Sequence, residues 1–189
     1  MKPLTLILIL FISAFCAAAQ SNNSGASGTE ILNHIYYFRP DSLIALEMTD
    51  GQMEQKTKGL GYGGSEAGIV IDGDKSPLRI KSGDSIHFAI KMGTTLMDPT
   101  MTIKLYRFDF RKGKREAILS SQGGAYSHAK STSNANEISL NMEKSGSDNF
   151  IMTPASRLPP GEYGFMNVMS VKMQGGRTAI YTIFAFGID

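Results

Sequence analysis

Residues 59–64 read GLGYGG and fit the G-x-G-x-x-G pattern that is typical of dinucleotide-binding proteins. In that pattern a buried strand runs into a tight turn and then a helix, whose N-terminal amides hold the pyrophosphate of the cofactor. Here the charged and polar run EQKTK precedes the glycines, and a strand candidate at residues 68–72 follows them. Because the chain offers no helix after the turn, the sequence predicts a loop and no bound cofactor.

Serine motifs of acyl-transfer enzymes also occur, in an arrangement that argues against that chemistry. Gly63, Ser65 and Ala67 nearly form a nucleophile elbow, which requires a strand-to-helix turn on a large α/β sheet. Between Ser127 and Asn149 the sequence contains SHAK, KSG and SDN, which match or approach the three motifs of serine β-lactamases. In those enzymes the motifs come from widely separated elements, whereas here they crowd into one polar segment. We therefore expect no catalytic serine.

A small hydrolase on a sandwich fold is an alternative function that the sequence leaves open. Pairs of carboxylates for glycoside hydrolysis are recognised by their separation in space, and no local motif marks an Asp or Glu in this chain. Such an enzyme would have to bring two carboxylates, or a serine and a histidine, into one cleft.

The candidate metal ligands are histidines and methionines. The three histidines lie far apart and have no carboxylate at the spacing of a zinc site: His34, His87 and His128. Thioethers suit Cu(I), and Met166, Met169 and Met173 follow the pattern M-x-x-M-x-x-x-M. On a strand, however, Met169 and Met173 share a face while Met166 points away. We predict no metal site and no cofactor, with methionine-based Cu(I) handling as a further alternative function.

Two polar loops rich in glycine or serine are the candidates for a binding surface. They span residues 58–68 and 122–136 and carry Tyr62 and Tyr126, respectively. Loops projected by rigid strands commonly carry binding residues, so we assign these two tyrosines as candidate contacts. Glycan sites usually present aromatic platforms, and the chain has no tryptophan. That absence favours a protein partner or a structural role over a carbohydrate ligand.

Residues 1–19 have the layout of a secretory signal peptide. A basic start precedes a short apolar run and then small residues, and the run is too short to span a bilayer comfortably. Ala17 and Ala19 favour cleavage before Gln20. A lipid anchor on Cys16 is the less favoured alternative, because the bulky Phe15 precedes this cysteine.

The composition limits the cellular compartments and the classes of binding partner that we expect. Residues 20–30 form a flexible polar tether, and residues 31–189 are long enough to build one domain with its own core. The formal charge is +2 without a basic stripe, which argues against nucleic acid and anionic membranes as partners. Cys16 is the only cysteine, so we expect no disulfide, and no other segment is apolar enough to span a membrane. Cysteine-free export is typical of a bacterial protein of the periplasm, the outer surface or the medium.

Short apolar segments separated by turn residues predict a β-protein. Residues 34–38 and 43–48 predict a hairpin, and residues 85–92 alternate so that their apolar side chains share one face. Residues 101–110 change phase near Tyr106, which predicts a β-bulge. No stretch shows a helical period with caps. About ten short strands at this spacing predict an antiparallel sandwich with little helix.

The C-terminal third narrows this prediction. Residues 158–163 read LPPGEY, a Pro-Gly turn followed by a tyrosine. The segment resembles the corner before the penultimate strand of immunoglobulin-like and fibronectin-type sandwiches, which gives Pro160, Gly161 and Tyr163 a structural role. The closing run TAIYTIFAFGID is apolar at nearly every position, as a strand covered on both faces would be. Together, PPGEY and FGID resemble uncharacterised secreted bacterial β-sandwich proteins, which implies a fold and no particular activity.

We therefore expect an exported, single-domain, all-β protein, built as an immunoglobulin-like antiparallel sandwich without intrinsic catalysis. Its predicted role is binding or structural, at the cell envelope, with an unidentified protein or envelope component as partner.

Overall fold

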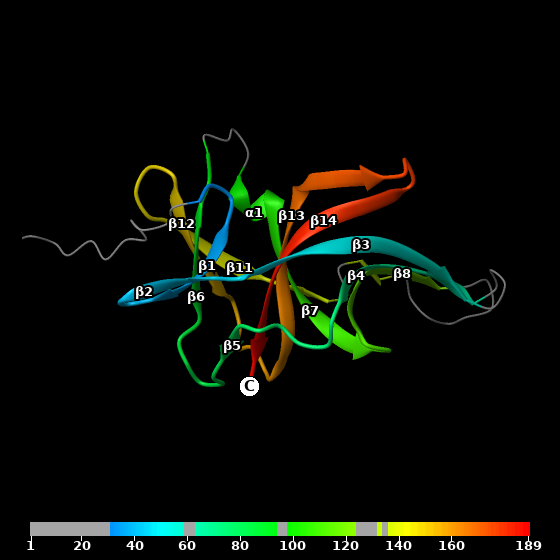
Figure 1. Cartoon of the computed structure of the whole chain (residues 1–189), viewed down its shortest axis with the longest axis horizontal. Helices are drawn as coiled ribbons and strands as arrows, with labels where there is room; N and C mark the ends of the chain where they lie inside the picture. Colours follow the sequence, from blue (N-terminus) through cyan, green and yellow to red (C-terminus); the bar gives the residue numbers. More distant parts are fainter. Residues whose placement is uncertain (1–30, 59–62, 94–97, 124–131, 134–135) are drawn as a thin grey trace, which may run out of the picture.

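The computed structural model describes residues 31–58, 63–93, 98–123, 132–133 and 136–189, which form almost entirely β-structure (Figure 1). The smaller of two sheets has five strands in the order β11 (Leu140–Lys144), β12 (Asn149–Pro154), β6 (His87–Lys91), β1 (Ile35–Arg39) and β2 (Ser42–Ala45). The larger sheet has nine, in the order β10 (Glu137–Ile138), β7 (Ile103–Arg111), β13 (Gly161–Gln174), β14 (Thr178–Ile188), β3 (Glu47–Thr57), β4 (Gly64–Asp72), β8 (Lys114–Gly123) and β9 (Thr132–Ser133), with β5 (Arg79–Ile80) beside β14. The predicted all-β class is confirmed.

Helix is confined to one short turn in the described part of the chain. This turn, α1, spans Pro99–Thr102, and the side chain of Asp98 caps it by accepting a hydrogen bond from the amide of Thr100. None of the described residues forms a helix long and apolar enough to cross a membrane. The described residues form fourteen strands, more than the ten or so that were predicted, and three of them, β5, β9 and β10, have only two residues each.

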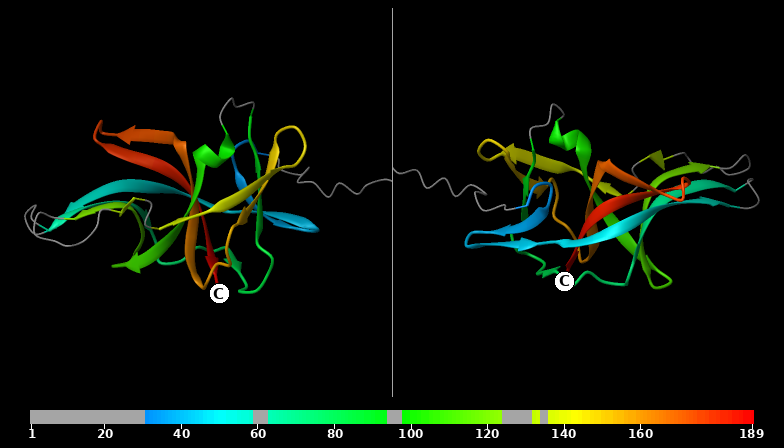
Figure 2. Two further views of the ribbon diagram at one scale, coloured as in Figure 1. Left: turned by 180° about the vertical axis from the view of Figure 1, so that it is seen from behind. Right: turned by 45° about the horizontal axis from the view of Figure 1, so that its top comes forward.

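The larger sheet closes on itself. Strand β7 pairs with β13 along one edge and with β8 along the other, so that β7, β13, β14, β3, β4 and β8 form a six-stranded barrel. The turn between β7 and β8 makes this possible, because Lys112 and Gly113 adopt positive φ angles of 51° and 79°, which suit a tight hairpin. Figure 2 shows the β13–β14 hairpin and the long strand β3 extending away from the smaller sheet. The arrangement therefore differs from two open, facing sheets.

The apolar side chains form two cores on opposite sides of a shared wall. The first core lies between the five-stranded sheet and β7, β13 and β14, and the second fills the barrel. Strand β14 contributes Phe184, Phe186 and Ile188 to the first core, and Ile183 and Ala185 to the second. The predicted covering of this strand on both faces is confirmed, and it explains why its sequence is apolar at consecutive positions.

The two cores also account for the change of phase in β7, where the predicted β-bulge is wrong. The strand pairs with β13 without interruption from Ile103 to Phe108. Ile103 and Leu105 face the first core, whereas Tyr106 and Phe108 face the second. Apolar residues of opposite phase thus serve two cores, and no extra residue is inserted. The irregularities in pairing lie elsewhere, between Ala67 and Gly68 of β4 and between Met166 and Val171 of β13.

Several local predictions are confirmed, and one loop is shorter than expected. Strands β1 and β2 form the predicted hairpin, and Phe88, Ile90 and Met92 are buried together in the first core. The predicted loop at residues 58–68 begins where β3 ends, at Thr57, but it is shorter than expected because β4 already begins at Gly64. A strand therefore lies on each side of the GLGYGG segment and no helix follows it, whereas a dinucleotide site requires one.

Glycine is required where the barrel wall lies close to Ile183. A Cβ atom at Gly51 would lie 2.6 Å from Cγ1 of Ile183, and one at Gly164 would lie 2.7 Å from its Cγ2. Such separations are too short for carbon atoms, so the large side chain of β14 fits only because its neighbours on β3 and β13 have none.

Candidate functional site

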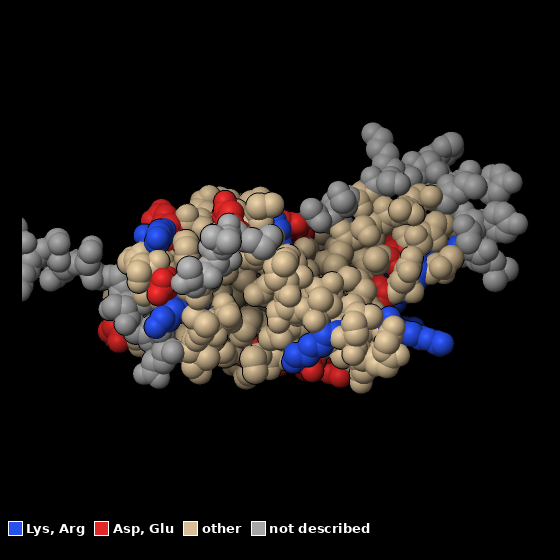
Figure 3. Space-filling model, turned by 90° about the horizontal axis from the view of Figure 1, so that it is seen from above, with Lys and Arg blue, Asp and Glu red and all other residues tan. Residues whose placement is uncertain are grey.

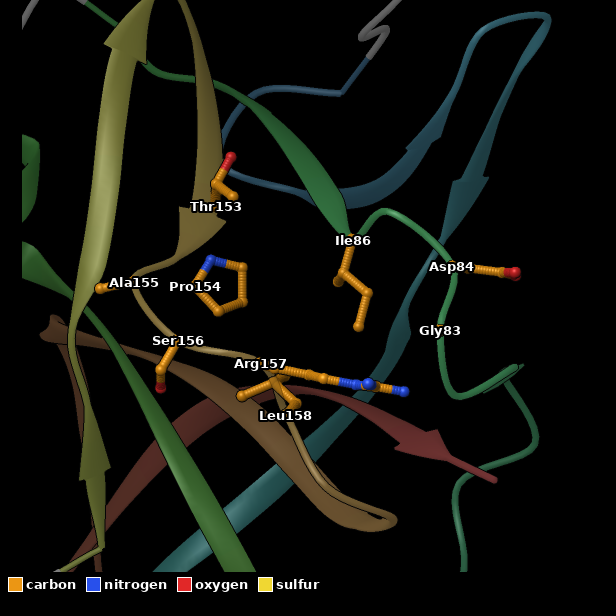
Figure 4. Close-up of a pocket in the computed structure, with 9 residues that line it drawn as sticks. All are labelled: Gly83, Asp84, Ile86, Thr153, Pro154, Ala155, Ser156, Arg157 and Leu158. Atoms are coloured by element: carbon orange, nitrogen blue, oxygen red, sulfur yellow. The ribbon is translucent and has the colours of Figure 1, made fainter.

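Two neighbouring hollows flank the loop of residues 155–160 that connects β12 to β13. The first hollow, of about 250 Å³, lies between this loop and the segment before β6 (Figure 4), and its lining residues are Gly83, Asp84, Ile86 and residues 153–158. The second hollow, of about 390 Å³, lies between the same loop and strands β7 and β10, and its lining residues are Arg107, Asp109, Tyr163 and residues 136–138 and 156–159. Residues 156–158 line both hollows, so a ligand laid over this loop would reach both.

The first hollow combines one guanidinium with an apolar floor. The side chain of Arg157 runs toward Gly83 in Figure 4, and a Cβ atom at Gly83 would lie 3.8 Å from its Nη2. Leu158 is buried at 3% exposure, and Ile86 and Pro154 complete the apolar lining. The side chain of Asp84 lies at the rim and points outward.

The second hollow holds charges of both signs. Arg107 and Asp109 are exposed and lie two residues apart on β7, so their side chains share a face of that strand. Nearer its start, the same face of β7 packs in the first core. Glu137 of β10 lines the hollow as well, and its Oε1 lies 3.2 Å from Nζ of Lys104, which neutralises it.

Tyr163 fixes the loop that separates the hollows. Its ring is fully buried in the first core and stacks on Phe186, with 5.5 Å between ring centroids. Its hydroxyl donates a hydrogen bond of 2.6 Å to the carbonyl of Pro159, and Gly161 begins β13 directly after Pro160. Burial raises the pKa of Tyr163, and the positive charge of Arg107 offsets part of that increase. The tyrosine therefore stays protonated and holds the loop to the core.

Two other arginines form ion pairs at one end of the barrel, and of these Arg115 is buried while Arg79 is partly exposed. Arg115 is 1% exposed and lies against two carboxylates, at 3.2 Å from Glu47 and 3.7 Å from Glu162. Arg79 forms ion pairs with the carboxylates of Glu162 and Asp189. The backbone amide of Ser76 donates a further hydrogen bond of 2.9 Å to Glu162. We call these groups the barrel-end cluster. Its charges are satisfied internally, although Nε of Arg115 is buried without a described hydrogen-bond partner.

By comparison, the arginines that line the hollows are exposed and have no described ion-pair partner. Neither Arg107 nor Arg157 forms an ion pair with any carboxylate in the part of the chain that the structure describes. A guanidinium offers five donors in a planar fork, which suits carboxylates and other planar acceptors. On the face seen in Figure 3, basic and acidic side chains occur side by side, and neither sign forms an extended patch.

Most of the residues that the sequence singled out are not brought into this site. Tyr62 and Tyr126, the predicted contacts, lie outside the described residues, as do the signal-peptide and tether segments and the S-x-x-K pair Ser127 and Lys130. Ser65 lies within strand β4. The S-D-N residues 147–149 lie in the turn between β11 and β12 and at the start of β12. Of the predicted structural residues, only Tyr163 lines a hollow.

The candidate metal ligands are dispersed, and one of them, His128, lies outside the described residues. Met166 is buried in the barrel core, whereas Met169, within the irregularity in β13, and Met173, beyond it, are exposed. His34 packs against Phe184, burial lowers its pKa, and its Nε2 has no described partner. His87 contacts Thr153 instead, at 3.0 Å. No three His, Cys, Asp or Glu side chains converge in the residues that the structure describes.

Sequence reasoning missed Arg107, Asp109 and Arg157. Their hollows are built from four segments that lie far apart in the chain, so no local motif marks them. The alternation of charge in RFD on β7 is the one signal that could have drawn attention to the second hollow. Comparisons with protein-family models, with curated proteins and with solved structures found no match for this chain. The function is therefore argued from the geometry of the site.

Proposed function

We propose that this protein is an exported, non-catalytic binding protein of the cell envelope, and that it binds its ligand across the two hollows beside residues 155–160. The signal-peptide pattern of residues 1–19 supports export. We also propose that the fold is related to immunoglobulin-like sandwiches. The buried Tyr163 at its turn, and the packing of the five-stranded sheet on β7, β13 and β14, support that relation.

The observation that carries the binding proposal is the state of Arg107 and Arg157. The chain encloses Arg79 and Arg115 with carboxylates, yet it leaves the two arginines of adjoining hollows without one among the described residues. A loop held by a buried tyrosine keeps the hollows preformed, which lowers the ordering cost of binding. Preformed hollows with a few convergent polar groups are typical ligand sites.

A hydrolase is a second candidate because Asp109 and Glu137 line one hollow. Two carboxylates in one cleft are what glycoside hydrolysis requires. The ion pair between Glu137 and Lys104 favours a structural role for one of them. Turnover of chromogenic glycosides by the wild type, abolished by both Asp109→Asn and Glu137→Gln, would establish the enzyme and overturn the non-catalytic proposal.

Cu(I) handling has less support. The burial of Met166 separates it from Met169 and Met173. A Cu(I) titration in which these three methionines are replaced together by leucine tests it, and an unchanged affinity excludes the site.

Thermal unfolding against a ligand panel tests the binding proposal. The panel contains capped peptides, neutral oligosaccharides, oligogalacturonate and inorganic phosphate. A ligand present at a hundredfold excess over its Kd should raise the Tm of the wild type by roughly 5–10 °C, because it binds only the folded chain. The double variant Arg107→Gln, Arg157→Gln should lose this shift, and Arg177→Gln, in the distant β13–β14 turn, should keep it. Equal shifts in wild type and double variant would place the ligand elsewhere.

A further inference from the structure

The two hollows share an unusual balance of charge. Arg157 lines both hollows and Arg107 lines the second. Each hollow also has a carboxylate that forms no ion pair with either guanidinium among the described residues: Asp84 at the rim of the first and Asp109 in the second. Each hollow therefore offers both a cationic donor and an anionic acceptor to a ligand. This arrangement distinguishes the site from a purely basic anion cradle.

The balance disfavours two classes of ligand. A polyanion would gain from Arg107 and Arg157 but would be repelled by Asp84 and Asp109, since like charges brought together on binding are costly. A neutral glycan would need an aromatic platform, and the one aromatic residue lining either hollow is Tyr163, whose ring is fully buried.

We propose that the ligand is an extended peptide segment of mixed charge, which crosses residues 156–158 and places an acidic side chain against Arg157 or Arg107 and a basic one against Asp109 or Asp84. The apolar floor formed by Leu158 and Ile86 accepts an aliphatic side chain between the charges. A peptide supplies carboxylates, ammonium groups and apolar side chains at successive residues. This inference rests on the proposed binding function and names the chemistry that the site selects.

An array of capped octapeptides provides the probe. Each peptide is acetylated and amidated, so that its charges come from side chains alone, and its positions vary among Lys, Glu, Leu and Gln. The best binders should contain Lys, Glu and Leu together. In solution, replacing either all Lys or all Glu of the best binder with Gln should weaken binding by about tenfold, because charge-assisted hydrogen bonds at the hollows are lost. Measurement at low and high salt should show the affinity falling as salt screens the exposed pairs.

Matched protein variants assign the contacts. Arg157→Gln or Arg107→Gln should abolish the advantage of Glu in the peptide, and Asp109→Asn should abolish the advantage of Lys. Arg177→Gln should change neither. An all-acidic peptide or oligogalacturonate that binds as tightly as the mixed peptide overturns this inference while the binding function stands. An array without any binder sensitive to these variants also overturns it. If in addition no member of the thermal panel depends on Arg107 and Arg157, the proposed binding function falls as well.

Discussion

The barrel-end cluster and the two hollows use the same side chain for opposite purposes. Arg115 and Arg79 are held between carboxylates, and Arg115 is removed from water. Arg107 and Arg157 lie in the open with no described ion-pair partner. A buried charge must be paired, because its desolvation costs several kcal/mol. An exposed charge carries no such requirement. We infer that Arg79 and Arg115 stabilise the fold, whereas Arg107 and Arg157 are available to bind a ligand.

The two regions also differ in what surrounds the arginines. At the barrel end, Glu162 accepts from Arg79 and from the amide of Ser76, so its carboxylate is satisfied from several sides. In the hollows the local structure is held by backbone hydrogen bonds and by the hydroxyl of Tyr163, and no described carboxylate forms an ion pair with Arg107 or Arg157. Removing an arginine should therefore affect stability in the first region and ligand affinity in the second.

The largest expected effect is on stability at the barrel end. Arg115→Ala leaves Glu47 and Glu162 without their shared partner, and should lower the free energy of unfolding by about 3–5 kcal/mol. Arg157→Gln is the matched control and should change it by less than about 0.5 kcal/mol, as an exposed substitution does. Urea unfolding followed by circular dichroism measures both values. Similar losses in the two variants would remove the distinction between the regions.

The next effect concerns the loop between the hollows. Tyr163→Phe removes the hydroxyl that binds the Pro159 carbonyl, and should cost about 1 kcal/mol of stability, the usual net value of such a hydrogen bond. Because the ring and its packing remain, the core should be otherwise unaffected. Ligand affinity should fall as well, since the loop is no longer held in place. Unchanged affinity in this variant would mean that the loop is positioned by other contacts.

The smallest effect is a pH dependence at the barrel end. Hydrogen bonding to Arg79 lowers the pKa of Asp189 below its usual value. A carboxyl with a lowered pKa in the folded state adds stability above its unfolded pKa, near 3.9, and loses it as the pH falls through the lower folded value. Asp189→Asn should therefore be less stable than the wild type at neutral pH. Its curve of stability against pH should meet that of the wild type in acid, and a difference that persists there would contradict the assignment.

The sequence predicts the local features of this fold well because each leaves a pattern within a few residues. The β1–β2 hairpin, the buried face of β6 and the double covering of β14 all follow from periodicity. The closure of the barrel does not, since it depends on β8 pairing with β4 along most of its length and with β7 only near the turn. The polar end of β3, from Gln52 to Thr57, likewise gives no strand signal, because it faces solvent on the extended hairpin.

The candidate site could not be predicted from the sequence for a related reason. Arg157 stands in a loop whose neighbours in space, Gly83 and Ile86, are more than seventy residues earlier in the chain. Its lack of an ion-pair partner is a property of three-dimensional packing. The structural role of Tyr163 beside its turn could be predicted from LPPGEY, but the hollows on either side of the loop could not.

The wall shared by the two cores has a consequence for how the chain acquires its structure. Both cores contain residues of β13 and β14, so neither can be completed until the segment after residue 160 has been synthesised. The barrel likewise cannot close, because β13 and β14 connect β7 to β3. A nascent chain of this protein therefore cannot complete either core before β13 and β14 have been synthesised. Completing the fold then depends on contacts between distant parts of the polypeptide, which makes this step slow.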